Sequence, residues 1–306
     1  MKYLLILLAI SSFAADPASF ARRRVHIRAL LAQSDYVPAL AEARLLNREW
    51  PDDIETYQMM ATAHLELGNY QQADEALQWM LDLRIGKADV PGYWLLARFR
   101  EVTGDTDGAI EAMNAAFGRL QTGEKADRSR MLAYLAHLQI LSGKMILAGK
   151  ILRESDGTDI ETQLVQAQLF RAQAKQKDAI LVLRELASKH LHPCHLYALA
   201  EASGDSADYT AFELAARKLR ASPDNANREL TIYLAGPGHR PAEALEIARH
   251  ASIDRRDIWT LHALSVALAA SGDRDGASKV MAEVLAVGTQ DPVILAQAAR
   301  LGIKPQ

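Results

Sequence analysis

Apolar and polar positions along the chain recur with the period of amphipathic helices, and short turn signals separate the apolar stretches. Four of these turns read as a glycine followed by a polar residue: Gly68-Asn69, Gly104-Asp105, Gly143-Lys144 and Gly272-Asp273. Glycine is favoured just beyond the C-terminus of a helix because it adopts left-handed backbone geometry without strain. The pattern therefore predicts helix, short turn and helix, repeated along the chain, with no strand-like alternation.

Small residues recur at regular intervals through these predicted helices. Eight alanines are spaced 31 to 39 residues apart, with a mean of 34: Ala39, Ala73, Ala109, Ala148, Ala179, Ala211, Ala244 and Ala277. Five of them have a small partner twelve residues earlier, in the pairs Ala61/Ala73, Ala97/Ala109, Ala136/Ala148, Ala167/Ala179 and Ser265/Ala277. We expect a solenoid of stacked helix hairpins, with the small residues where the two helices of a hairpin cross.

The offsets within one unit resemble those of the tetratricopeptide repeat (TPR). The second unit shows them in the series Tyr57, Met60, Ala61, His64, Gly68-Asn69-Tyr70, Ala73, Leu77 and Met80. The resemblance covers about residues 20–292 and rests on eight phased copies rather than on one match. It implies an all-α solenoid of about eight hairpins forming a right-handed superhelix, of the type found in exported bacterial TPR proteins.

Some units depart from the pattern. Ile27 replaces the small residue in the first unit, as in an atypical capping repeat, and residues 203–209 suggest that the turn of the sixth unit is about two residues longer. Residues 236–241 form a stiff turn with a proline at the start of the next helix, and residues 120–127 are read as an irregular connection. We expect the solenoid to span residues 15–292, and residues 293–306 to form a capping helix and tail.

The N-terminus reads as a secretory signal. Met1-Lys2 precedes an uncharged stretch from Tyr3 to Ile10, and small residues at Ser12 and Ala14 permit cleavage after Ala14. The apolar run is too short to cross a bilayer as a helix, which needs about 20 residues. We therefore expect residues 1–14 to be a signal peptide and the chain to be periplasmic or secreted; the alternative is an extra apolar helix covering the first repeat.

Charge and composition narrow the classes of partner. The net charge of −3 argues against nonspecific nucleic-acid binding. The basic run Arg22-Arg23-Arg24 with Arg28 is interpreted as the solvated face of a capping helix, although an interfacial membrane helix stays open; stable membrane insertion is not expected. The single cysteine, Cys194, excludes an internal disulfide.

Motifs that carry chemistry are missing from the sequence. A P-loop, a dinucleotide fingerprint, a zinc-protease helix and a nucleophile elbow are all absent, so we predict no enzyme activity and no cofactor. Acidic pairs at 52–53, 205–208 and 254–257 are expected to cap helices. The cluster His190, His192, Cys194 and His195 is expected to be a helix start with a packed cysteine and no metal, with a metal-binding protein of the cell envelope as the rival.

The resemblance implies that the first helix of each repeat lines a concave groove that binds a partner protein segment. The positions that it assigns to this face are Arg24, Arg28, Gln58, Thr62, Trp94, Arg98, His137, Gln168, Arg171, Glu229, Tyr233, Trp259 and His262. Aromatic residues and arginines are typical of binding hot spots, although Trp94 and Trp259 would equally serve to seal repeats together. We predict a noncatalytic protein-interaction scaffold. The lysine and asparagine clamp of some relatives is replaced by Arg24 and Arg28, which disfavours a chaperone-tail adaptor.

Overall fold

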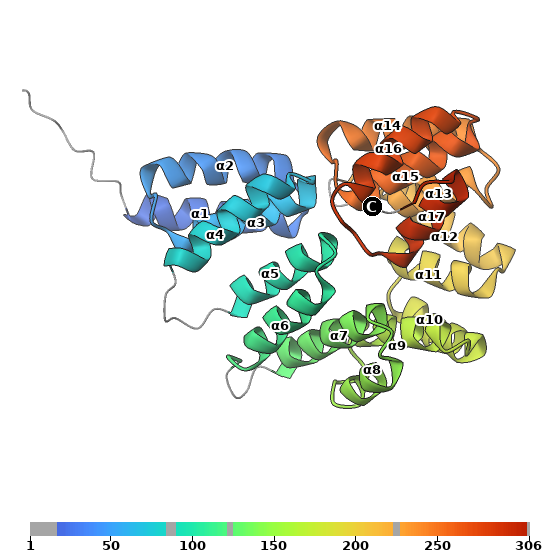
Figure 1. The fold of residues 1–306 in the computed structure, drawn as a ribbon, viewed down its shortest axis with the longest axis horizontal. Coiled ribbons are helices and arrows are strands. Elements are labelled where there is room, and N and C mark those ends of the chain that lie inside the picture. Colours follow the sequence, from blue (N-terminus) through green and yellow to red (C-terminus); the bar gives the residue numbers. More distant parts are fainter. Residues whose placement is uncertain (1–16, 84–89, 121–124, 223–226, 305–306) are drawn as a thin grey trace, which may run out of the picture.

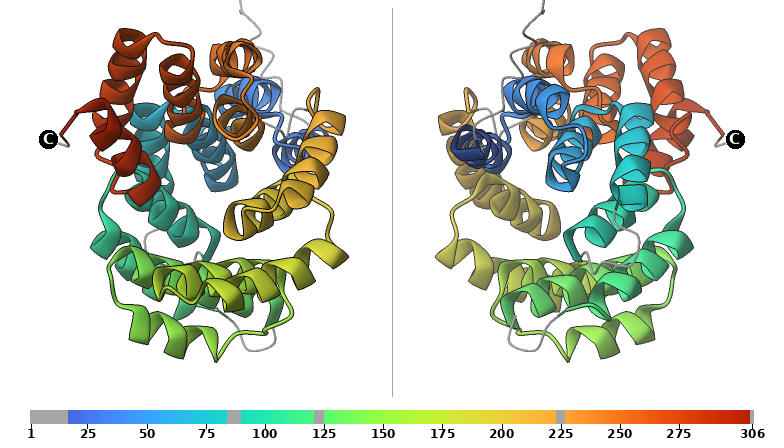
Figure 2. Two further views of the ribbon diagram at one scale, coloured as in Figure 1. Left: turned by 90° about the vertical axis from the view of Figure 1, so that its right-hand side faces the viewer. Right: turned by 90° about the vertical axis from the view of Figure 1, so that its left-hand side faces the viewer.

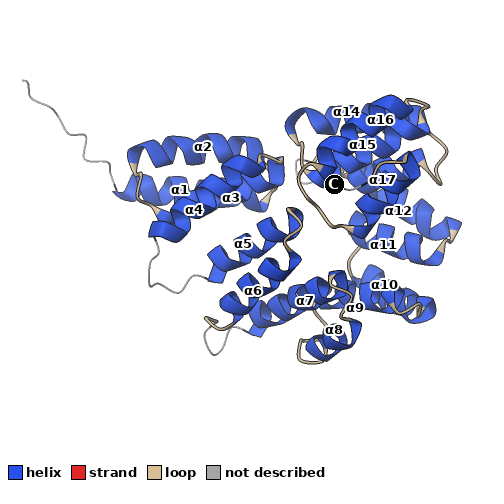
Figure 3. Ribbon diagram, viewed as in Figure 1, coloured by secondary structure: helices blue, strands red, loops and turns tan. Residues whose placement is uncertain are grey.

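The computed structural model describes residues 17–83, 90–120, 125–222 and 227–304, and within these ranges the chain forms seventeen helices and no strand (Figures 1 and 3). The predicted signal segment, residues 1–14, lies outside the described residues. None of the helices in the described ranges combines the length and the apolar character that a bilayer crossing requires.

Sixteen of the helices described form eight hairpins, numbered here as repeats 1 to 8, and the seventeenth follows them. The pairs are α1 (Pro17–Ala32) with α2 (Tyr36–Glu49), α3 (Ile54–Leu67) with α4 (Tyr70–Leu83), α5 (Val90–Val102) with α6 (Thr106–Phe117), α7 (Lys125–Leu141) with α8 (Met145–Leu152), α9 (Ile160–Ala172) with α10 (Gln176–Lys189), α11 (Pro193–Ser203) with α12 (Ser206–Lys218), α13 (Arg228–Ala235) with α14 (Pro241–Asp254), and α15 (Ile258–Ala270) with α16 (Arg274–Leu285), followed by α17 (Pro292–Leu301). The predicted all-α solenoid is confirmed.

The small residues lie where the two helices of a hairpin cross. Ala61 and Ala73 are fully buried, and so are the partners in the third and fourth repeats. In repeat 8 the Ser265 hydroxyl donates a hydrogen bond to the carbonyl oxygen of Ala277, over 2.9 Å. This bond joins the two positions of a pair directly, so the twelve-residue spacing marks the helix crossing as predicted.

The predicted glycines end the first helices. Gly68, Gly104, Gly143 and Gly272 all have positive φ, between 73° and 87°. In repeat 2 the N–H of Asn69 then bonds back to the carbonyl of His64 at 2.8 Å, which satisfies a carbonyl that the helix end leaves free. Each of these turns thus has only two or three residues between its helices and brings the next helix back antiparallel.

Two predictions about repeat 6 are wrong, one on the length of its turn and one on the position of Ala211. Its turn, Gly204-Asp205, is as short as the others, and Ala211 is exposed instead of lying at the crossing. The crossing is made by Ala200 and Phe212, which keep the twelve-residue interval and are both fully buried. The turn therefore lies about three residues earlier in this repeat, which is nearly one helical turn and so preserves the buried face.

Two other expectations concern the connections. The irregular connection expected over residues 120–127 ends earlier than predicted, because α7 begins at Lys125 and residues 125–127 are helical. Ile27 fills the crossing of repeat 1 with its side chain fully buried, and α17, which contacts α16, begins at Pro292, one residue before the expected capping segment. Of the acidic pairs, Asp53, Asp205 and Asp257 accept backbone N–H groups at helix starts, as predicted.

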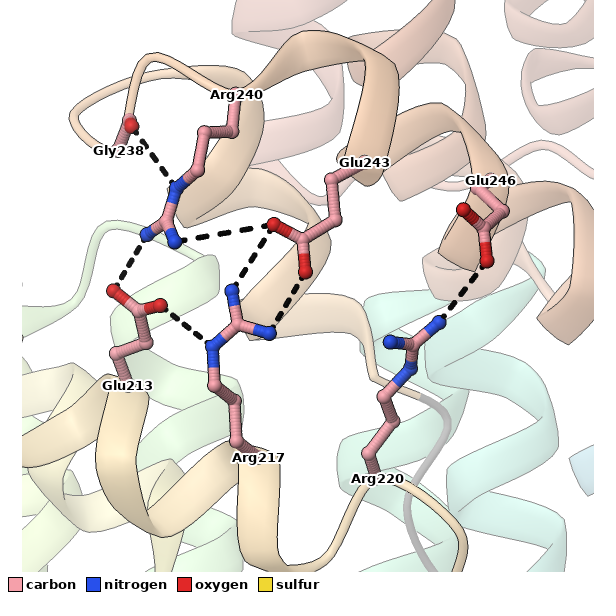
Figure 4. A network of polar contacts seen from close by, with 7 residues as sticks. All are labelled: Glu213, Arg217, Arg220, Gly238, Arg240, Glu243 and Glu246. Carbon is pink, nitrogen blue, oxygen red and sulfur yellow. Dashed lines mark hydrogen bonds and ion pairs between the residues drawn. The ribbon is translucent and has the colours of Figure 1, made fainter.

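Ion pairs strengthen the junction between repeats 6 and 7 (Figure 4). Arg217 bridges Glu213 on its own helix and Glu243 on α14, with nitrogen–oxygen distances of 2.6 and 2.7 Å. Arg240 pairs with Glu213 at 2.6 Å and donates from Nε to the carbonyl of Gly238. These contacts fix the proline-containing turn that replaces the glycine turn in repeat 7.

The stack of repeats closes on itself. Figure 1 shows the blue N-terminal repeats and the orange and red C-terminal repeats facing each other above the green repeats that join them, and Figure 2 shows the same arrangement from its two sides. The backbone N–H of Arg256 bonds to the carbonyl of Leu67 at 2.9 Å, and the N–H of Ile258 bonds to the Tyr70 hydroxyl at 2.8 Å. We call this contact between repeats 1–3 and repeats 7–8 the seam.

The side chain of Arg255 and the close approach of two glycines, Gly68 and Gly104, complete the seam. Arg255 donates to the carbonyl of Ser34 at 2.6 Å and lies over the Tyr36 ring. A side chain at Gly68 would collide with the backbone of Arg256, and one at Gly104 with the carbonyl of Gly288. The turns of the early repeats therefore contact the later backbone closely, and glycine is required there for lack of space as well as for its φ.

Candidate functional site

A cavity of about 320 Å³ lies along the first helices of repeats 2, 3 and 4. It is lined by Gln58 and Thr62 from α3, by Val90, Pro91, Trp94, Leu95 and Arg98 from α5, and by Asp127 and Arg130 from α7. We call it the groove cavity. Four residues that the sequence assigned to the binding face converge here: Gln58, Thr62, Trp94 and Arg98.

Trp94 lines this cavity and packs across a repeat boundary. Its indole stacks on the ring of Tyr134 in repeat 4, with ring centroids 6.0 Å apart and planes 8° from parallel. Trp94 therefore seals two repeats together, as one of its two interpretations predicted, and its part in binding a partner stays a prediction.

A row of polar contacts continues from the groove cavity along the first helices. Arg98 pairs with Glu66 of α3, and Glu101 accepts hydrogen bonds from the Tyr134 hydroxyl and, at 3.0 Å, from His137 Nε2. The other ring nitrogen of His137 lies 2.8 Å from the amide oxygen of Gln168 on α9. These contacts link repeats 2 to 5 on one face.

The charges in this row stabilise one another. Burial, the largest single effect, disfavours charged Glu101 and His137. The hydrogen bond between them, the attraction of their opposite charges and the hydrogen bonds from Tyr134 and Gln168 together outweigh it, so the pKa of Glu101 is lowered and that of His137 is raised. His137 is thus held against Glu101 through one ring nitrogen, and Gln168 of the next repeat contacts the other.

The predicted basic residues of repeat 1 are also partnered. Arg24 and Arg28 both pair with Glu55 of α3, and Arg23 pairs with Glu49 at 2.7 Å. These arginines thus stabilise the junction with repeat 2, which favours the interpretation of α1 as a capping helix with a charged, solvated face.

The remaining predicted residues do not join the groove cavity. Arg171 is exposed, and Tyr233 stacks on Tyr209 with ring centroids 5.2 Å apart. Trp259 packs against the C-terminal core, while His262 is only 4% exposed. Burial, with a smaller effect of the Arg300 charge, lowers the pKa of His262 to about 4. We leave these side chains out of the proposed binding surface.

Glu229 belongs to a second cavity, which the seam encloses. This seam cavity has a volume of about 210 Å³ and is lined by Ser34, Tyr36, Glu66, His192, Pro193, Cys194, Leu219, Arg228, Glu229 and Arg255. Its walls come from repeats 1 and 2 on one side and, on the other, from repeats 6 and 7 and from Arg255 in the connection that follows α14. It exists only because the ring is closed.

Sequence reasoning missed five residues of the groove cavity. Val90 and Pro91 precede Trp94 on α5 by four and three residues, and Leu95 follows Pro91 by four, so these neighbours could have been found from helical periodicity. Asp127 and Arg130 could not have been found in this way, because the sequence predicts an irregular connection up to Asp127 and so gives no helix start there. The seam leaves no periodic signal, since it joins residues about 190 positions apart.

Comparison with known proteins supports the fold. No protein-family model and no curated protein matches the sequence. Among solved structures, the Cut9–Hcn1 hetero-tetramer of the APC/C is similar with a TM-score of 0.50 and 14% identity, covering 94% of this chain and 50% of that one. This chain thus spans about half the length of that relative, and the similarity concerns the fold alone.

Two further solved structures are similar over nearly their whole length. A tetratricopeptide repeat protein from Parabacteroides merdae has 12% identity and a TM-score of 0.46, with 93% of this chain and 99% of that one covered. The C-terminal part of a TPR repeat-containing protein from Cytophaga hutchinsonii has 15% identity and a TM-score of 0.44, with coverages of 90% and 98%.

Proposed function

We propose that this chain, which has the fold of a tetratricopeptide-repeat protein, is a noncatalytic scaffold that binds a segment of a partner protein in the groove cavity. The observation that carries the proposal is the convergence of Gln58, Thr62, Trp94 and Arg98 around one cavity. These residues come from two repeats and were selected by repeat position alone. Helical-repeat folds of this kind serve mainly as recognition surfaces, which supports a binding role over a catalytic one.

The lining of the groove cavity favours an extended segment with one bulky apolar side chain. Val90, Pro91 and Leu95 form an apolar wall around Trp94. Gln58 adds a side-chain amide, which can both donate to and accept from the backbone of a bound segment. Buried aromatic anchors ringed by polar groups supply most of the affinity in protein interfaces.

Site-specific photo-crosslinking tests this placement. A photoreactive residue at Gln58 should capture the partner, while the same residue at Gln78, exposed on α4, should not. Mass spectrometry of the adduct then identifies the bound segment. Equal capture from both positions, or capture from Gln78 alone, would place the partner elsewhere.

Export to the periplasm or beyond the cell is a separate proposal. It rests on the uncharged run from Tyr3 to Ile10 and the small residues at Ser12 and Ala14. N-terminal sequencing of the chain expressed in bacterial cells should find Ala15 as the first residue, in a released fraction. An intact Met1 in the cell interior would refute export.

A further inference from the structure

Three potential metal ligands lie together where α11 begins. His192, Cys194 and His195 each offer one ligand atom, and these atoms all lie within 4.8 Å of one another. The Nδ1 atom of His192 is 2.9 Å from the sulfur of Cys194. Imidazole and thiol groups are the ligands that zinc and related ions prefer.

The backbone explains how closely spaced residues converge. His192 has extended backbone geometry and caps α11, while Pro193 occupies the first turn and fixes its φ. The chain thus turns sharply between His192 and Cys194, which brings the His192 ring back over the sulfur. His195 follows on the first helical turn and is buried to 7% exposure.

His195 also has the support that a metal-bound histidine usually has. Its Nδ1 atom lies 3.2 Å from the carbonyl oxygen of His190. A hydrogen bond from Nδ1–H to this carbonyl leaves the lone pair on Nε2, which is then free for a ligand bond. Metal-binding histidines commonly donate their other ring N–H to a backbone carbonyl in this manner.

We propose that His192, Cys194 and His195 form a three-ligand site for Zn²⁺, with the fourth coordination position open to the seam cavity. Bond lengths of about 2.0–2.3 Å in a tetrahedral site place ligand atoms roughly 3.3–3.8 Å apart, so small side-chain rotations suffice. His192 and Cys194 line the seam cavity together with Glu229. The open position can therefore take a water molecule or the Glu229 carboxylate.

This proposal is independent of partner binding in the groove cavity. The two cavities share no lining residue, and the metal ligands come from repeat 6 while the groove cavity belongs to repeats 2 to 4. Binding of Zn²⁺ replaces the thiol proton of Cys194, which passes to solvent, and no redox step is involved.

Cobalt titration of the purified full-length chain tests the site, because Co²⁺ bound to a thiolate gives a charge-transfer absorption that Zn²⁺ does not. We expect one Co²⁺ per chain, with this absorption, and its displacement by an equimolar amount of Zn²⁺. Cys194→Ser should abolish the absorption. His195→Gln should weaken zinc binding at least tenfold, with circular dichroism confirming the helical fold.

His192→Asn separates a metal ligand from a simple helix cap. Asparagine caps helices well, so this variant should keep the stability of the parent while losing at least tenfold in zinc affinity. His190→Gln is the matched control and should bind like the parent, since only the backbone of His190 takes part. Absence of the absorption, or equal loss in His190→Gln, would overturn the proposal.

Discussion

At the scale of single residues, two buried histidines are the most informative side chains outside the cavities. His64 on α3 and His262 on α15 are 3% and 4% exposed. Burial lowers the pKa of each to about 4, with smaller effects from nearby arginines. Both are therefore neutral in the folded chain near neutral pH and are part of the core.

These histidines predict acid sensitivity. An unfolded histidine titrates near pH 6.5, so the unfolded chain binds more protons than the folded chain between about pH 6.5 and 4, and stability falls as the pH is lowered through this window. A pKa lowered by about 2.5 units corresponds to about 3 kcal/mol for His262. When the free energy of unfolding is measured with denaturant across this pH range, its slope against pH should be shallower for His262→Leu than for the parent chain.

The exposed His250 on α14 provides the control for this measurement. His250→Gln should leave the slope of stability against pH as in the parent. If His262→Leu also left it unchanged, His262 would not be a neutral core residue in the folded chain.

At the scale of elements, the hairpin is the unit that the sequence predicted best. Helices, turns and crossings follow from local signals, namely a glycine at the helix end and a small residue at the contact. The failure in repeat 6 is instructive, because counting alanines selected Ala211 while Phe212 makes the contact. A regular spacing of alanines assumes that the turn has the same position in every repeat, whereas in repeat 6 the turn lies about three residues earlier.

Leucine substitutions test this assignment of the crossings. Ala179→Leu adds three carbon atoms to a fully buried contact and should destabilise the fold by about 1–3 kcal/mol in urea unfolding. Ala211→Leu, at an exposed position of the equivalent helix, should change the free energy of unfolding by less than about 0.5 kcal/mol. If Ala211→Leu were the more destabilising of the two, Ala211 and not Phe212 would lie at the helix crossing of repeat 6.

At the scale of the whole molecule, closure of the ring was not predictable. Each repeat contacts its neighbours through local rules, but the position of repeat 8 relative to repeat 1 is the sum of many small rotations. The seam joins residues such as Tyr70 and Ile258, 188 positions apart, and the repeat pattern that contains Tyr70 does not indicate this contact. The lining of the groove cavity was predicted in part: repeat position identified residues such as Gln58 and Trp94, but not Asp127 and Arg130 on α7.

Glycine substitutions at two turns test the seam. Gly68 and Gly143 both have positive φ, so alanine costs roughly 1–2 kcal/mol of backbone strain at either site. At Gly68 the new methyl group would also meet the backbone of Arg256, whereas nothing lies within 4 Å at Gly143. Gly68→Ala should therefore be the more destabilising change and should increase the radius of gyration in small-angle scattering. Equal effects at the two sites would mean that the ring is open in solution.

Quantitative affinity capture tests most directly whether the groove cavity around Trp94 binds a segment of a partner protein. The tagged chain, its Trp94→Ala variant and a Trp79→Ala variant are compared, since Trp79 is 58% exposed on α4 and outside the cavity. The partner is then purified and its dissociation constant is measured with each chain. We expect at least tenfold weaker binding for Trp94→Ala, about 1.4 kcal/mol, and unchanged binding for Trp79→Ala. Unchanged binding by Trp94→Ala would contradict binding of the partner in this cavity.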